Sequence, residues 1–305
     1  MTQEQFSRPI QSPPKWKRWI LAARPKTLPA AAAPVVMGSF LAGWESAFKL
    51  LPAAAALMCA LLLQIGSNLA NDVFDFQRGA DREGRLGPVR VTQTGLLAPG
   101  EVKVGMGIIL AAAALCGLYL SWVSAWWLLV VGLLAILAAV GYSGGPIPFG
   151  YHGLGDVFVF IFFGIVAVSG TYFLQAGRFT LDVLTMSAVV GGLITNILVV
   201  NNLRDLESDR EAGKITLAAA VGPEWTRLEY ALFSGLAYAG PAWLILSRKI
   251  PPGAGVIFLA LPWSVRLIRQ VNLWEGSRLN RTLAETSLFA LGYVLLFGLG
   301  GSLLF

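Results

Sequence analysis

Two short stretches of the sequence place amides and carboxylates at helical spacing. The first contains SNLANDVFDF and the second contains NNLRDLESD. If each stretch is helical, residues four, seven or eight positions apart lie on the same side. The two sets are Asn68, Asp72 and Asp75 in the first stretch, and Asn201, Asp205 and Asp209 in the second. Each set therefore presents one amide and two carboxylates on one helix face.

Carboxylates this close repel one another, and beside a membrane they also lose solvation. Neighbouring Arg and Lys side chains offset this by ion pairing, and a divalent cation is the alternative. Mg²⁺ takes oxygen ligands, usually one or two carboxylates plus substrate phosphates. Basic side chains interleaved with the acidic ones suit a phosphate ligand. The expected diphosphate ligands are Arg85, Arg90, Arg204 and Lys214.

We therefore expect two Mg²⁺ ions, one at each set, that together hold one diphosphate. The expected metal ligands are Asn68, Asp72, Asp75, Asp205 and Asp209, with Asn71 and Asn201 as second choices. Asn68 and Asn201 are also expected to contact the substrate.

The elements that position these residues are membrane helices. The chain has 305 residues, 56% hydrophobic and only 13% charged, whereas a typical soluble domain has about 25% charged residues. This composition excludes a cytosolic globular enzyme, a disordered chain and a nucleic-acid-binding module. Membrane helices need about 20 mostly apolar residues. Nine stretches qualify: 28–44, 50–71, 104–121, 124–142, 155–176, 183–203, 227–247, 253–268 and 284–304.

The basic residues predict the orientation of these nine transmembrane helices. With a cytoplasmic N-terminus, all Lys and Arg residues lie on the cytoplasmic side except Lys49, Arg178, Arg248 and Lys249, as the positive-inside rule requires. The predicted organisation is a basic arm at 1–27 and a single all-α domain at 28–304, with cytoplasmic Asp-rich loops at about 72–103 and 204–226. Four helices separate the two loops, as an internal duplication would give. We expect two related halves around a central cavity.

Several segments resemble a known enzyme family. NDVFDFQRGAD resembles the first Asp-rich motif of the UbiA-type membrane prenyltransferases, and RDLESD resembles their second. RPKTLPAA, GPVRVTQTG, GYHGLGDVFVFIFFG and NNLRDLESDREAGKITLA are together similar to the 1,4-dihydroxy-2-naphthoate polyprenyltransferases of menaquinone synthesis. Relatives that prenylate 4-hydroxybenzoate commonly have an Asp four residues after the second Asp of the first motif. This chain has Gly79 there and Asp81 two residues later.

The resemblance implies transfer of a polyprenyl group from polyprenyl diphosphate to 1,4-dihydroxy-2-naphthoate, with loss of diphosphate and CO₂ to give demethylmenaquinol. Magnesium-assisted ionisation would precede electrophilic aromatic substitution. Metal ions and basic clamps stabilise the charge that develops on diphosphate. A dry chamber with aromatic walls would protect the allylic cation. The aromatic candidates are Phe74, Tyr142, Tyr151, Phe158, Phe162 and Tyr172, and Tyr142 stands apart because it ends a helix beside a Gly-Gly-Pro turn.

The acceptor needs a base for its hydroxyl proton and a cation for its carboxylate. His152 is the only histidine, and an unperturbed imidazole titrates at about pH 6.5. It is a candidate catalytic base, with a structural hydrogen bond as the alternative. Arg24 and Lys26 are candidate partners for the carboxylate, although Lys26 suits a topological anchor equally well.

Two other interpretations stay open. Within the family, the acceptor could be 4-hydroxybenzoate or homogentisate, or the donor could carry a phytyl group. Outside it, a secondary transporter also has duplicated halves and carboxylates at broken helices, but its site lies near the bilayer midplane. We expect a multi-pass protein of the bacterial inner membrane, in contact with lipid, with its active site toward the cytoplasm and with no nucleic acid partner.

Overall fold

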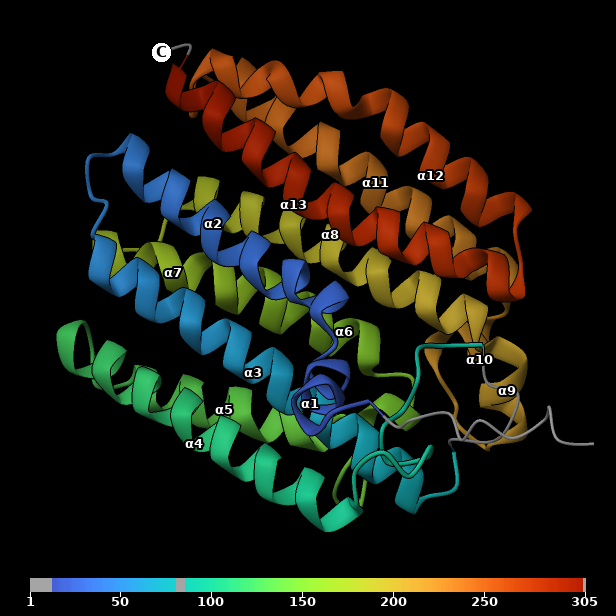
Figure 1. Ribbon diagram of the computed structural model, residues 1–305. Helices are drawn as coiled ribbons and strands as arrows, with labels where there is room; N and C mark the ends of the chain where they lie inside the picture. The colour runs from blue at the N-terminus through green and yellow to red at the C-terminus, as the bar shows by residue number, and fades with distance from the viewer. Residues whose placement is uncertain (1–12, 81–85, 304–305) are drawn as a thin grey trace, which may run out of the picture.

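The computed structural model describes residues 13–80 and 86–303, and these residues are almost entirely helical. Long helices run side by side in a tilted bundle (Figure 1). Seven helical segments are long and apolar enough to cross a membrane by length and composition. They are Lys15–Trp44, Leu50–Gln77, Pro99–Val123, Gly155–Ala176, Leu181–Arg204, Pro252–Leu273 and Gly276–Leu303. The described chain is therefore an all-α protein of the multi-pass membrane type.

Two of the nine expected spans differ from these seven. The stretch 124–142 holds α5 (Leu128–Gly141), which is apolar but has only 14 residues. The stretch 227–247 lies in α11 (Pro223–Leu246), which has 24 residues and carries charged side chains in its first two turns. Seven described segments, rather than nine, thus have both the length and the composition that a crossing requires.

The remaining helices follow in chain order, and their bounds locate the site described below. These are α1 (Lys15–Ala23), η1 (Pro25–Thr27), α2 (Leu28–Trp44), α3 (Leu50–Gln77), α4 (Pro99–Val123), η2 (Phe149–Tyr151), α6 (Gly155–Val159), η3 (Phe160–Val166), α7 (Ala167–Ala176), α8 (Leu181–Arg204), α9 (Leu206–Glu211), α10 (Leu217–Val221), η4 (Pro252–Ala260), α12 (Leu261–Leu273), η5 (Gly276–Arg278) and α13 (Leu279–Leu303).

Proline positions explain several helix boundaries. A proline in the first turn costs nothing, because that N–H has no partner within the helix. Pro29 and Pro262 stand in the first turns of α2 and α12. Pro262 therefore begins a helix, whereas the apolar pattern alone suggests an interrupted span. Pro34 lies buried inside α2, which continues through it.

The α6–η3–α7 segment packs closely on α8 through two glycines. A Cβ atom on Gly164 would lie 2.5 Å from the Cα of Gly191, and one on Gly191 would lie 3.0 Å from the carbonyl oxygen of Phe160. Small residues allow membrane helices to approach in this way. The middle of the segment, η3, is π-helical.

The short polar elements gather at one end of the bundle. Helices α1, α9 and α10 and the chain that leaves α3 lie at the end opposite the C-terminus (Figure 1). Helix α1 was not expected in the N-terminal arm; it packs against α3 and buries Ala22. The first Asp-rich stretch is helical as expected, because α3 continues to Gln77. Both Asp-rich stretches thus reach the same end of the protein.

Candidate functional site

A cavity of about 410 Å³ lies among the helices and reaches both Asp-rich stretches. Its polar lining comes mainly from α1–η1, α3, α8 and the segments that follow α3 and α9. The polar lining residues there are Arg24, Thr27, Gln64, Ser67, Asn68, Asn71, Asp75, Arg90, Asn201, Arg204 and Lys214, and α7 adds Thr171. The rest of the wall is mostly apolar. One cavity thus joins side chains from both predicted sets to a hydrophobic chamber.

Asp72 holds the segment after α3 against the helix. Only 1% of Asp72 is exposed. Its Oδ2 accepts a hydrogen bond from the N–H of Val91 at 3.1 Å, and its Oδ1 accepts one from the N–H of Thr92 at 2.9 Å. The Arg24 guanidinium is 3.9 Å from Oδ2. Asp72 is absent from the cavity lining, so in this arrangement it positions Arg90 by fixing the next residue of the chain.

Asp75 does line the cavity, and both its oxygens have partners. Oδ2 accepts a hydrogen bond from the Arg90 guanidinium at 2.9 Å. Oδ1 accepts one from the hydroxyl of Tyr151 at 2.8 Å. The Asp75 and Arg90 side chains are 7% and 5% exposed, so this ion pair is shielded from water.

The amides of α3 are held by neighbours that the sequence did not single out. Asn68 donates to the carbonyl oxygen of Ala23 at 2.9 Å and to the hydroxyl of Thr27 at 3.0 Å. Gln64 lies one turn earlier and donates to the Oδ1 of Asn68 at 3.3 Å. A lone amide four residues before Asn68 in an apolar run is the signal that would have identified Gln64.

The second set lies where α8 gives way to α9. Asp205 separates the two helices, but its N–H still donates to the carbonyl oxygen of Asn201 at 3.1 Å. The N–H of Asp209 likewise donates to the carbonyl oxygen of Asp205 at 2.8 Å. The three residues therefore stay on one side. Arg204 donates to both oxygens of Asp205 at 2.8 and 2.5 Å, and to the side-chain oxygens of Asn201 and Asn280 at 2.9 Å each.

Lys214 reaches the same cavity from the loop after α9. Its Nζ lies 3.6 Å from Oδ1 of Asp209, and its side chain is 14% exposed. Together with Arg24, Arg90 and Arg204 it gives the cavity four cationic side chains.

Aromatic rings form part of the apolar wall. Tyr142, Phe149, Phe158 and Phe162 line the cavity. The rings of Phe149 and Phe158 stack with centroids 3.9 Å apart, and Tyr142 meets Phe149 edge-on at 5.6 Å.

Some predicted residues lie elsewhere. Lys26 and His152 are exposed and are not among the cavity-lining residues. The Nδ1 of His152 lies 2.8 Å from the carbonyl oxygen of Pro148. Phe74 and Tyr172 are likewise absent from the lining. Arg85 and Asp81 lie outside the described residues.

Comparison with known proteins identifies the family. Residues 31–299 match the UbiA prenyltransferase family. The chain belongs to this family. It is 41% identical over 280 residues to the 1,4-dihydroxy-2-naphthoate octaprenyltransferase of Mycobacterium tuberculosis, covering 91% of this chain and 94% of that protein. It is 35% identical over 295 residues to the protein of the same name from Haemophilus influenzae, covering 94% and 96%.

The fold is also that of the UbiA family. A UbiA homolog from Archaeoglobus fulgidus, solved bound to DMAPP and Mg²⁺, matches with a TM-score of 0.68 at 16% identity, over 94% of this chain and 100% of that one. This likeness shows the arrangement of helices, since the sequences have diverged.

The donor set of the cavity suits a hard divalent cation such as Mg²⁺. Among the described residues, no three His, Cys, Asp or Glu side chains gather as a metal cluster. The cavity lining instead includes one carboxylate residue, Asp75, and the amide residues Asn68, Asn71 and Asn201, whose side-chain oxygens each accept a hydrogen bond from a neighbouring side chain. Mg²⁺ commonly takes one or two carboxylates and completes its shell with phosphate oxygens and water. The residues therefore fit an ion that binds together with diphosphate.

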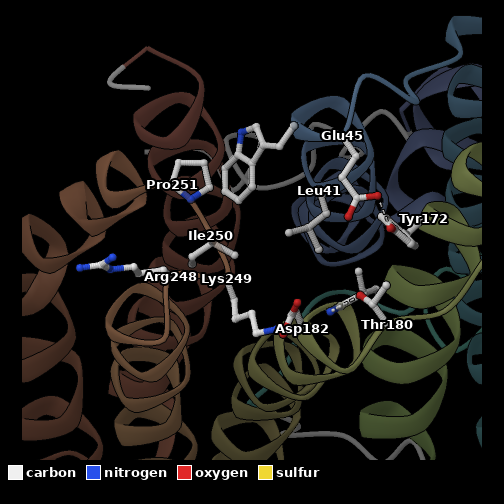
Figure 2. A pocket seen from close by; sticks show the side chains of 11 residues that line it. Leu41, Glu45, Tyr172, Thr180, Asp182, Arg248, Lys249, Ile250 and Pro251 are labelled. Atoms are coloured by element: carbon white, nitrogen blue, oxygen red, sulfur yellow. Dashed lines mark hydrogen bonds between the residues drawn. The ribbon is translucent and has the colours of Figure 1, made fainter.

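A second cavity of about 320 Å³ lies at the other end of this UbiA protein, by the C-terminus of α2 and the N-terminus of α8. Figure 2 shows the Tyr172 hydroxyl directed at Glu45, to which it donates a hydrogen bond. Arg178 also donates to Glu45, at 2.8 Å. Because this Tyr–carboxylate–Arg group is far from the Asp-rich stretches, it is a useful internal control.

Proposed function

We propose that this UbiA family member transfers a polyprenyl group from its diphosphate to 1,4-dihydroxy-2-naphthoate, releasing diphosphate and CO₂ and forming demethylmenaquinol. The observation that carries this proposal is the single cavity that joins cationic side chains of both Asp-rich regions, and the carboxylate of Asp75, to an apolar, aromatic-lined chamber. The names of the relatives support the naphthoate acceptor and the polyprenyl donor.

The polar end would bind the diphosphate. When the allylic C–O bond breaks, its electron pair leaves with the diphosphate, and positioned cations stabilise that charge. Arg90 and Arg204 now pair with Asp75 and Asp205, so the incoming phosphate oxygens would compete with carboxylates for the guanidinium groups. Bound Mg²⁺ would supply further neutralisation of the leaving group, with Asp75 and the cavity-lining amides as its nearest protein donors.

The apolar chamber would hold the allylic cation and exclude water. Phe149, Phe158 and Phe162 present ring faces and edges along one wall, and aromatic faces attract cations. Water in the chamber would convert the cation to an alcohol, so the scarcity of polar lining away from the diphosphate end favours transfer to the acceptor.

The acceptor would attack through the ring carbon that bears its carboxylate. A C–C bond to the allylic carbon forms, the bond to the carboxylate breaks, and its electron pair returns to the ring as CO₂ leaves. Arg24 is our choice of partner for the carboxylate, because it lines the cavity whereas Lys26 does not. We assign His152 a structural role, since its Nδ1 is close to Pro148 and its side chain is exposed.

We further propose nine membrane crossings, with α5 and α11 as the two that the seven apolar segments do not include. The basic N-terminal arm and the Asp-rich loops would face the cytoplasm, and the domain would occupy residues 28–304 of a bacterial inner-membrane protein surrounded by lipid. The proposal also includes two Mg²⁺ ions. Asp72, Asp205 and Asp209 would join their ligand set once diphosphate displaces the present partners of these carboxylates.

The test uses purified protein in detergent with 1,4-dihydroxy-2-naphthoate and a polyprenyl diphosphate, with Mg²⁺ and then with EDTA. We expect a prenylated product that requires Mg²⁺ and disappears in Asp75→Ala and Asp205→Ala. Asp182→Asn in the second cavity should retain activity. Product with 4-hydroxybenzoate but not with the naphthoate would overturn the acceptor. Folded protein that prenylates no aromatic acceptor would favour a transporter.

A further inference from the structure

Tyr151 contacts both Asp-rich regions at once. It lies in η2, and its hydroxyl donates to Oδ1 of Asp75 at 2.8 Å. Its carbonyl oxygen accepts from the N–H of Ile215 at 3.1 Å, and His152 forms an isolated parallel bridge with the same Ile215. The Nζ of Lys214 lies 5.5 Å from the centre of the Tyr151 ring. One residue thus joins α3 to the loop after α9.

The hydroxyl of Tyr151 controls the orientation of Asp75. The other carboxylate oxygen, Oδ2, is held by Arg90. If Arg90 turns toward a diphosphate, the hydrogen bond from Tyr151 still restrains the Asp75 carboxylate. A carboxylate oxygen has two lone pairs, so Oδ1 can keep this bond while it meets another partner. Hydrogen bonds of this kind orient residues that bind ions or phosphates.

The ring of Tyr151 controls the position of Lys214. Cations within about 6 Å of an aromatic centroid are attracted to its face. Lys214 satisfies this at 5.5 Å, and the Arg78 guanidinium lies 5.6 Å from the same ring. The backbone next to Lys214 is also fixed, because the N–H of Ile215 donates a hydrogen bond to the carbonyl oxygen of Tyr151. The lysine is therefore held at the cavity by the residue that holds Asp75.

We propose that Tyr151 is a positioning residue that joins Asp75 and Lys214 into one diphosphate-binding unit. The inference rests on the proposed function, and it adds a link between the two Asp-rich regions that neither motif contains. Tyr151 is not among the residues that line the cavity, so it acts through Asp75 and Lys214. Its loss should weaken binding of the prenyl diphosphate and leave binding of the aromatic acceptor unchanged.

The experiment measures the Kd of a non-reactive farnesyl thiolodiphosphate with full-length protein in detergent, with and without Mg²⁺, beside the KM values of both substrates. Tyr151→Phe removes the hydroxyl and keeps the ring, and Tyr151→Leu removes both. Tyr172→Phe is the matched control, because it also removes a hydroxyl that donates to a carboxylate beside an arginine, Glu45 with Arg178.

We expect Tyr151→Phe to raise the Kd of the analogue about tenfold, since a hydrogen bond to a charged group is lost. Tyr151→Leu should raise it about threefold more. The KM of the naphthoate should stay within about twofold, and Tyr172→Phe should leave the Kd unchanged. The inference would be overturned if folded Tyr151→Phe bound the analogue with the wild-type Kd. It would also be overturned if Tyr172→Phe lost as much affinity for the analogue, or if the KM values of both substrates rose equally. Wild-type protein that neither binds the analogue nor forms product would instead refute the proposed function, and this inference with it.

Discussion

Replacing Asp72 by Asn tests whether this carboxylate holds the segment after α3 in place, apart from any role in metal binding. The two oxygens of Asp72 accept hydrogen bonds from the N–H groups of Val91 and Thr92, at 3.1 and 2.9 Å. An asparagine has one oxygen to accept with, and its NH₂ group would face the other N–H. The substitution keeps the volume of the side chain and leaves one buried backbone donor without an acceptor.

The expected size of the effect follows from that single lost acceptor. An unsatisfied buried donor costs about 1–3 kcal/mol. A penalty of this size raises the population of molecules in which the segment leaves α3 by about 5- to 150-fold. Arg90 precedes Val91 in the chain, so it should lose its fixed position in the cavity and the KM for the prenyl diphosphate should rise.

Amide hydrogen exchange of metal-free protein measures the effect directly. We expect the Val91 and Thr92 amides to exchange about 5- to 150-fold faster in Asp72→Asn. Asp209→Asn serves as the control, because Asp209 forms its ion pair with Lys214 in the loop after α9. Unchanged protection of both amides in an inactive Asp72→Asn protein would refute the reasoning and leave Asp72 with a role in ion binding alone.

Two further substitutions test the cavity and the packing around it. Arg90→Gln should raise the KM of the prenyl diphosphate about tenfold or more, because it removes a buried cation, and steady-state kinetics with an unchanged KM for the diphosphate would contradict this. Gly164→Ala should lower the free energy of unfolding by about 1–3 kcal/mol, since its Cβ would lie 2.5 Å from the Gly191 Cα. Gly170→Ala, where nothing lies within 4 Å, should be nearly neutral in thermal unfolding, and equal losses in the two variants would argue against the close approach.

The sequence was sufficient to predict the helical bundle, because the helices depend on local spacing. Apolar runs identify the long helices through their length. Asn68, Asp72 and Asp75 share a buried helix face because α3 continues through them. The sequence also predicted that the two Asp-rich stretches, which are far apart in the chain, lie at one cavity. The reason is that the long polar segments of an apolar chain must lie at the ends of its helices.

The partners of these side chains could not be predicted, because they depend on contacts between distant segments. Nothing in the spacing shows that Thr92 folds back on Asp72, or that Tyr151 reaches Asp75. The single histidine attracted attention through its rarity and its titration near neutral pH, yet His152 is exposed beside the site. Gln64 was overlooked because it lies within an apolar run that reads as membrane span.

The π-helical segment Phe160–Val166 has a consequence for how such a chamber can change. A π-helical turn accommodates an additional residue within a helix. Deleting one residue within Phe160–Val166 would therefore let the segment become α-helical while the helices on either side keep nearly their present faces. The same deletion inside the α-helical α7 would instead rotate the residues beyond it by about 100° with a shift of about 1.5 Å. The π-helical segment is thus the place where this wall of the chamber can lose a residue and still present the same α7 side chains to the cavity.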